Sequence, residues 1–146
     1  MTIAFNAVHV IKPKLKYRIV SRWLKQVVLK FGCVTGVLTY IFCCDEYLKE
    51  INSKYLSHDY YTDIVTFDYR EGDIVSGDMF ISIDRVRENS ALYHCDINDE
   101  FLRVIVHGVL HLIGLNDSNE TEKLTMREME NECIFMYKEI CNEYIK

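Results

Sequence analysis

The sequence contains no apolar run long enough to cross a membrane, which takes about 20 residues. The run from Val34 to Cys44 holds about eleven residues, a length that suits a buried strand. The first residues also lack the charged segment, apolar segment and small-residue cleavage site that together mark a secretory signal. These absences lead us to expect a cytoplasmic protein that does not associate with a membrane.

Proline is nearly absent, and no two cysteines form a Cys-x-x-Cys pair. The one proline, Pro13, is predicted to stand near the start of a helix, where its missing N–H costs no hydrogen bond. Without a secretory signal, we expect reduced thiols and no disulfide framework. The six cysteines are Cys33, Cys43, Cys44, Cys95, Cys133 and Cys141.

Acidic residues are missing from residues 1–44, although the whole chain carries a net charge of −5. This segment has a charge of +7, and the rest of the chain has a charge of −12. A basic segment on an acidic body can contact RNA, because phosphate contacts supply most of the sequence-independent affinity for nucleic acids. A solvated basic helix face would show the same pattern. The basic residues are Lys12, Lys14, Lys16, Arg18, Arg22, Lys25 and Lys30.

About half of the 146 residues are hydrophobic, which is enough for the core of a single domain, and we place that domain at residues 1–146. The hydrophobic periodicity predicts strands interleaved with helices, an arrangement that indicates one mixed α/β layer structure of the α+β class. The expected strands cover about 3–10, 37–42, 63–69 and 78–83. The expected helices cover about 14–31, 46–56, 84–93, 98–113 and 118–144.

The segment from His107 to Asp117, His-Gly-Val-Leu-His-Leu-Ile-Gly-Leu-Asn-Asp, carries the clearest chemical signal. On a helix, His107 and His111 lie on one face with Cβ atoms roughly 5–6 Å apart, so their imidazoles can converge on one ion. Gly114 can adopt positive φ and end the helix, which gives Asp117 a route to the same ion. Three protein ligands with an open fourth position are typical of a catalytic zinc. The alternative is a pair of hydrogen-bonded core histidines.

The same ligand spacing occurs in metzincin zinc proteases, which carry a Glu directly after the first His as general base. Gly108 occupies that position here. Because glycine cannot take a proton from water, the sequence argues against peptide hydrolysis by that mechanism. Two His and one carboxylate also bind iron in non-haem oxygenases. Those ligands usually lie on the strands of a barrel, whereas this chain predicts a helix.

Three further motifs precede the histidines: Asn52 near a helix end, Thr62–Phe67 (Thr-Asp-Ile-Val-Thr-Phe) and Gly77–Ser82 (Gly-Asp-Met-Phe-Ile-Ser). With a glycine between the two helical histidines, this order and spacing resemble the YbeY family of metal-dependent endoribonucleases, also described as rRNA maturation factors. The resemblance covers nearly the whole chain. It implies a sheet of about four mostly parallel strands surrounded by helices, with the metal-binding helix near the C-terminal third.

The resemblance also implies a function. It predicts a single-strand-specific, zinc-dependent endoribonuclease that acts in rRNA processing, namely 16S rRNA 3′-end maturation, and in ribosome quality control. One Zn²⁺ would be held by His107, His111 and Asp117. The expected partners are ribosomal RNA, the small ribosomal subunit and an assembly GTPase. The catalytic candidates, which lie where the family's cleft is expected, are His58, Asp59 and Asp63.

The chain departs from the family pattern at three positions. Asp117 stands where the family usually has a third His, and its extra negative charge should make the ion a weaker Lewis acid. Leu56 fills the position of an Arg thought to act on the substrate, and leucine cannot hold a phosphate. Tyr61 replaces a Pro. Two other functions therefore stay open: a non-enzymatic ribosome-assembly factor with a structural metal, and a metal-dependent hydrolase of another substrate.

Overall fold

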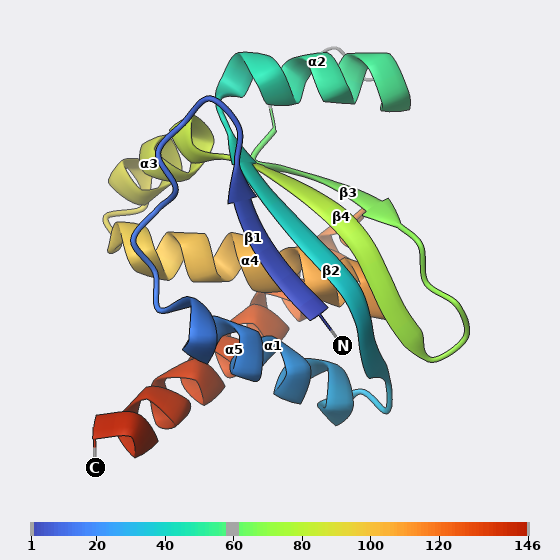
Figure 1. The fold of residues 1–146 in the computed structure, drawn as a ribbon, viewed down its shortest axis with the longest axis vertical. Helices are drawn as coiled ribbons and strands as arrows, with labels where there is room; N and C mark the ends of the chain where they lie inside the picture. The colour runs from blue at the N-terminus through green and yellow to red at the C-terminus, as the bar shows by residue number, and fades with distance from the viewer. Residues whose placement is uncertain (1, 58–61, 146) are drawn as a thin grey trace.

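The computed structural model describes residues 2–57 and 62–145, and these ranges form four strands and five helices (Figure 1). The α+β fold expected from the sequence is confirmed, and each expected element is present. Along the chain the elements are β1 (Thr2–Ala7), α1 (Tyr17–Lys30), β2 (Val34–Cys43), α2 (Asp45–Leu56), β3 (Ile64–Asp68), β4 (Ile74–Ser82), α3 (Ile83–Leu92), α4 (Ile97–Ile113) and α5 (Glu120–Ile145).

Two element ends near the N-terminus differ from the prediction. β1 ends at Ala7, before the expected residue 10, and His9 adopts a left-handed φ of 58° that is incompatible with a strand. α1 begins at Tyr17, so Pro13 precedes the helix and does not form part of its first turn. The carbonyl of Pro13 instead accepts a hydrogen bond from the Tyr17 hydroxyl.

The strands form one sheet in the order β1-β2-β4-β3. β2 pairs in parallel with β1 and with β4, whereas β3 runs antiparallel to β4. The expectation of a mostly parallel sheet is thus correct for two of the three pairs and wrong for β3. The physical reason is the short loop of residues 69–73 between β3 and β4, since a parallel pair needs a long crossover connection.

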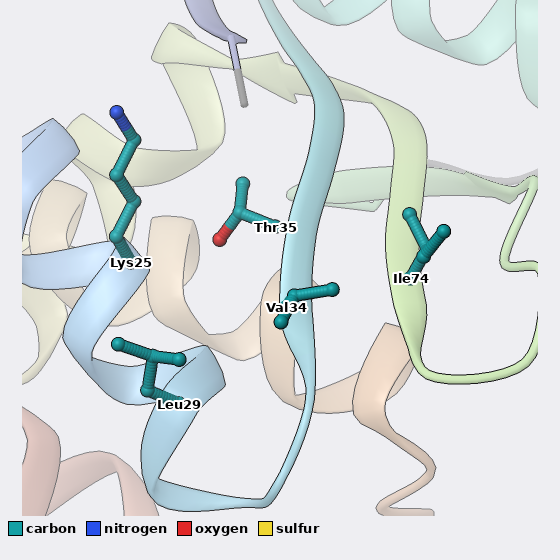
Figure 2. Close-up of a pocket in the computed structure, with 5 residues that line it drawn as sticks. All are labelled: Lys25, Leu29, Val34, Thr35 and Ile74. Atoms are coloured by element: carbon teal, nitrogen blue, oxygen red, sulfur yellow. The ribbon is translucent and has the colours of Figure 1, made fainter.

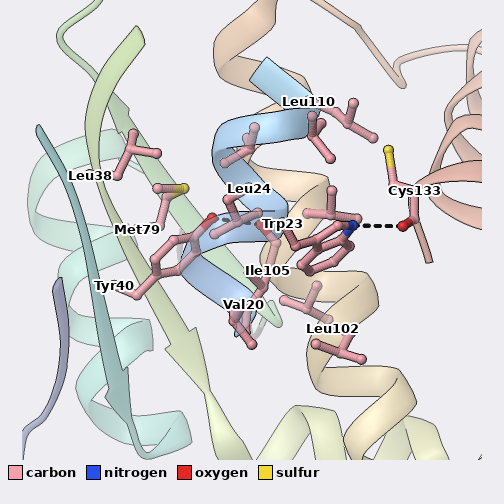
Figure 3. Packing of buried hydrophobic residues seen from close by; sticks show 14 of the residues in the cluster. Val20, Trp23, Leu24, Leu38, Tyr40, Met79, Leu102, Ile105, Leu110 and Cys133 are labelled. Atoms are coloured by element: carbon pink, nitrogen blue, oxygen red, sulfur yellow. Dashed lines mark hydrogen bonds between the residues drawn. The ribbon is translucent and has the colours of Figure 1, made fainter. Parts of the chain in front are cut away.

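The main core lies between one face of the sheet and the helices α1, α4 and α5 (Figures 1 and 3). Two buried polar groups are satisfied by the backbone of neighbouring elements: the Tyr40 hydroxyl donates to the carbonyl of Ile105 at 2.8 Å, and Trp23 Nε1 donates to the carbonyl of Cys133 at 2.6 Å. These bonds hold β2 to α4 and α1 to α5. α4 is therefore buried against both the sheet and other helices, as its apolar sequence predicts.

The opposite face of the sheet is covered by α2 over β3 and β4. Leu48 and Ile51 of α2 pack with Val65 of β3 and Cys43 of β2 in a second, smaller apolar cluster. α3 packs chiefly against α4. Among the described residues, no helix combines the length and the apolar character needed to span a membrane.

Candidate metal centre

Helix α4 brings the two histidines of the motif together. Asp96 caps the start of the helix, where its Oδ1 accepts hydrogen bonds from the backbone N–H groups of Asn98 and Asp99. One helical turn separates His107 from His111, so their rings lie on the same face with centroids 4.5 Å apart. The predicted helical placement of both imidazoles is confirmed.

The chain turns back directly after α4. Gly114 adopts φ 125°, a conformation that glycine takes at little cost, and ends the helix. The N–H of Leu115 then donates to the carbonyl of Leu110 at 3.0 Å. This turn returns Asp117 to the histidines, and its Oδ2 lies 3.4 Å from Nε2 of His107 and 3.4 Å from Nε2 of His111.

These three atoms have the spacing of a metal site. Ligand bonds of about 2.0–2.1 Å at tetrahedral angles place ligand atoms roughly 3.3–3.4 Å apart. Both distances from Asp117 to the histidines match that separation. The three side chains are partly buried, so an open coordination position would face solvent. The chemistry and the spacing of these three residues therefore fit a metal ion.

Hydrogen bonds on the far side of each ring orient the imidazoles. Nδ1 of His107 lies 2.6 Å from Oε2 of Glu130, and Nδ1 of His111 lies 2.9 Å from the carbonyl of Leu115. Both partners are acceptors, so each Nδ1 carries a proton, and in the neutral ring Nε2 then presents its lone pair to the cluster. Histidines that bind metals commonly have such a partner on the other nitrogen.

Glu130 is buried at 5% exposure on α5, and it contacts α4 twice. Its Oε1 accepts from Arg103 Nη1 at 3.0 Å, while its Oε2 holds His107 one helical turn further along α4. Burial is the largest single influence and lowers the pKa of His107, but the hydrogen bond and charge of Glu130, together with the charges of Asp63 and Asp117, outweigh it. The pKa of His107 is therefore raised above its ordinary value.

Of the three catalytic candidates, Asp63 lies beside this cluster. It lines a polar hollow of about 180 Å³ together with His107, Glu130, Glu100 and Arg127. Burial raises the pKa of Asp63, and the charge of His107 only partly offsets that effect. The backbone carbonyl of Asp63 accepts from the N–H of Ser82 and so fixes the start of β3 against β4. The other two candidates, His58 and Asp59, lie outside the described residues.

Gly108 packs against the sheet. A Cβ at this position would come within 2.8 Å of Met79 Sδ and 2.9 Å of Ile64 Cδ1. The space that a side chain would need is thus filled by β4 and β3. A side chain at position 108 would require the ends of the Met79 and Ile64 side chains to move, and glycine itself offers no general base of the kind that metzincin proteases carry.

Sequence reasoning missed the two groups that orient the histidines. Glu130 lies 23 residues from His107, and only the packing of α5 on α4 brings them together. The available signal was weak: an acidic residue predicted on a helix that follows the metal motif.

A separate apolar hollow of about 470 Å³ lies between α1 and the starts of β2 and β4 (Figure 2). Figure 2 shows Lys25 and Leu29 of α1 on one side, with Val34, Thr35 and Ile74 on the strands. None of these lining residues is a carboxylate, imidazole or thiol. The hollow therefore offers no ligands for a metal ion and is not part of the His-His-Asp cluster.

Comparisons with known proteins agree with the motif order. A model of the family described as Endoribonuclease YbeY matches residues 5–138. A protein of Parabacteroides distasonis named Endoribonuclease YbeY is 48% identical over 97% of this chain and 99% of its own length. One of Bacteroides thetaiotaomicron with the same name is 45% identical over 93% of this chain and 99% of its own length.

The fold is also similar to a solved structure, the solution structure of TM1509 from Thermotoga maritima. The TM-score is 0.64 at 24% sequence identity, and the match covers 98% of this chain and 91% of that chain. At this identity the likeness shows the arrangement of the elements alone.

Proposed function

The chain belongs to the YbeY family of endoribonucleases, and on that premise we propose that residues 1–146 form one domain that cleaves single-stranded RNA with a metal ion held by His107, His111 and Asp117. The observation that carries the proposal is the equal 3.4 Å separation of Asp117 Oδ2 from the two Nε2 atoms. Two imidazoles and a carboxylate are a ligand set that zinc accepts, and we propose one Zn²⁺.

When bound, Zn²⁺ supplies Lewis acidity toward a phosphodiester and its attacking water. The chain's own residues prepare the site for it. Glu130 and the Leu115 carbonyl hold the imidazoles with Nε2 facing inward. Asp117 contributes one negative charge, which lowers the net charge of the loaded site. Asp63 is the described candidate for proton transfer, because it lies in the hollow beside His107 and burial favours its protonated form.

We propose rRNA processing as the biological role, at 16S rRNA 3′-end maturation and in ribosome quality control, in the cytoplasm. The partners would be ribosomal RNA, the small ribosomal subunit and an assembly GTPase. Only some of the basic residues in segment 1–44 support a contact with RNA. Arg22 and Lys30 pair with Glu143 and Glu132 of α5, so some of its charge is neutralised within the protein. The remaining basic residues of the segment are the candidates for phosphate contacts.

One observation favours a second function, a ribosome-assembly factor whose metal is structural. Leu56, where the family has an Arg, ends α2 with a partly exposed aliphatic side chain. Such a side chain offers no hydrogen bond to a phosphate in the transition state. In this case the loss of the metal would lower stability and ribosome binding, and no RNA product would form. A hydrolase acting on another ester substrate would bind the same metal but leave RNA intact.

The experiment compares wild type with His111→Ala for bound metal and for cleavage of a single-stranded RNA. His94→Asn is the matched control, because His94 lies in an exposed turn with φ 53°, a conformation that Asn tolerates. The proposal expects one equivalent of metal and cleavage in wild type and in His94→Asn, and neither in His111→Ala. A wild type that binds no metal, or a metal-loaded wild type that leaves RNA intact, would contradict it.

A further inference from the structure

The carbonyl groups at the end of α4 find partners in two different ways. The last four carbonyls of a helix lack partners within the helix. Those of Leu110 and His111 accept from the backbone N–H of Gly114, and Leu110 also accepts from Leu115. Those of Leu112 and Ile113 accept from a side chain far along the chain, the guanidinium of Arg70, whose Nη1 lies 3.2 Å and 2.6 Å from them.

Arg70 is itself fixed in the loop between β3 and β4. Its Nε donates to the carbonyl of Gly72 at 2.7 Å, and its backbone N–H donates to Asp68 Oδ1 at 2.8 Å. Its Nη2 lies 3.6 Å from Sγ of Cys33, the residue directly before β2. A cation at a helix C-terminus also interacts favourably with the helix dipole. Arg70 thus ties the β3–β4 loop to the end of α4.

This helix end carries two of the three candidate ligands. His111 lies in the last turn of α4, and its ring is oriented by the carbonyl of Leu115, two residues beyond Ile113. The path from Gly114 to Asp117 starts at the same point. A shift of the Leu112–Ile113 backbone would therefore move the His111 ring and the turn that returns Asp117 to it.

We propose that Arg70 is a positioning residue for the metal centre, which acts through the carbonyls of Leu112 and Ile113 and touches neither metal nor substrate. The inference rests on the proposed function, because it assumes that the His-His-Asp cluster binds an ion. Removing a group that orients a metal ligand typically weakens metal affinity by about 10–100-fold. The same loss is expected for Arg70→Met, with a fall in kcat and little change in KM for RNA.

Arg70→Lys is the conservative variant. Lysine keeps the charge at the helix end, but a single ammonium cannot reproduce the planar fork that reaches Gly72 and both α4 carbonyls. We expect intermediate metal affinity. Arg85→Met is the matched control, because Arg85 of α3 pairs with Asp45, with Nε 3.1 Å from each carboxylate oxygen, and with Glu88 of its own helix. It should lose stability and keep its metal affinity.

The test is a Zn²⁺ titration against a competing chelator on chelator-stripped protein, with folding checked by circular dichroism. Affinity that falls at least about tenfold in Arg70→Met, partly recovers in Arg70→Lys and stays unchanged in Arg85→Met supports the proposal. Equal affinity in wild type and Arg70→Met, or an equal loss in Arg85→Met, overturns it. If Arg70→Met does not fold, the Zn²⁺ affinity of Arg70→Lys is compared with that of wild type, and equal affinities overturn the proposal. A wild type without metal affinity contradicts the proposed function instead.

Discussion

Glu130 Oε2 lies 2.6 Å from His107 Nδ1, so an acid on α5 orients a candidate metal ligand on α4. The same carboxylate holds Arg103 at 3.0 Å, one turn earlier on α4. Glu130 is 5% exposed, and a buried acid is stable in this position because both of its oxygens are paired. The contact makes the geometry of the metal centre depend on the packing of α5.

Replacing Glu130 with Gln keeps the size of the side chain but removes its charge. The bond to His107 becomes weaker, Arg103 loses its charge partner, and we expect metal affinity to fall by about 10–100-fold. Zn²⁺ titration in the presence of a competing chelator measures this change. Glu128→Gln, at an exposed position on the same helix, should bind as tightly as wild type. Unchanged metal affinity in Glu130→Gln would contradict the role of Glu130 in orienting His107.

Asp117 should determine both the affinity of the site for the metal ion and the Lewis acidity of the bound ion. Asp117→Asn removes the charged ligand, and the loss of affinity should exceed the roughly 100-fold typical of an orienting partner. Asp117→His should keep the ion while raising the net charge of the site, which makes the ion a stronger Lewis acid. The acid limb of the kcat/KM profile for RNA cleavage should then move to lower pH. An unshifted limb in an active Asp117→His would argue that Asp117 is not a ligand.

The raised pKa of His107 predicts that the metal-free protein loses stability as the pH rises, whereas metal binding becomes stronger. In the metal-free protein, the imidazolium stabilises the fold fully below the unfolded pKa of about 6.5, and this contribution is lost as pH rises through the folded pKa. Metal binding requires the neutral ring, so it strengthens over the same range. The difference in Tm between zinc-loaded and stripped protein should therefore grow from pH 6 to pH 8. A constant difference would contradict a role for His107 as a ligand.

Leu56→Arg introduces the charge that the family resemblance leads us to expect at this position. Leu56 is 37% exposed at the end of α2, so a longer side chain can extend into solvent without disturbing the core. A donor that reaches the reacting phosphate can raise kcat by up to about 100-fold. Leu56→Met is the control of similar size without charge. Equal cleavage rates for the two variants would show that position 56 does not act on the substrate.

Local sequence patterns predict the His107–Asp117 motif, whereas the groups that orient it depend on tertiary packing. The spacing of His107, His111 and Gly114 follows from helix periodicity and from the backbone freedom of glycine, so the sequence alone placed them correctly. The antiparallel direction of β3 follows from the short connection that the expected strands at 63–69 and 78–83 already implied, whereas the expectation of a mostly parallel sheet came from the family resemblance. Glu130 and Arg70 reach the α4 helix from distant elements, and no local pattern marks such contacts.

The most direct measurement is single-turnover cleavage of a labelled single-stranded RNA by chelator-stripped protein as Zn²⁺ is added. Cleavage should be absent without the ion, rise in proportion to it and level off at one equivalent per chain. The same titration of Asp117→Asn should give no cleavage over that range. Cleavage by the stripped wild-type protein at the full rate would contradict a catalytic metal ion at His107, His111 and Asp117.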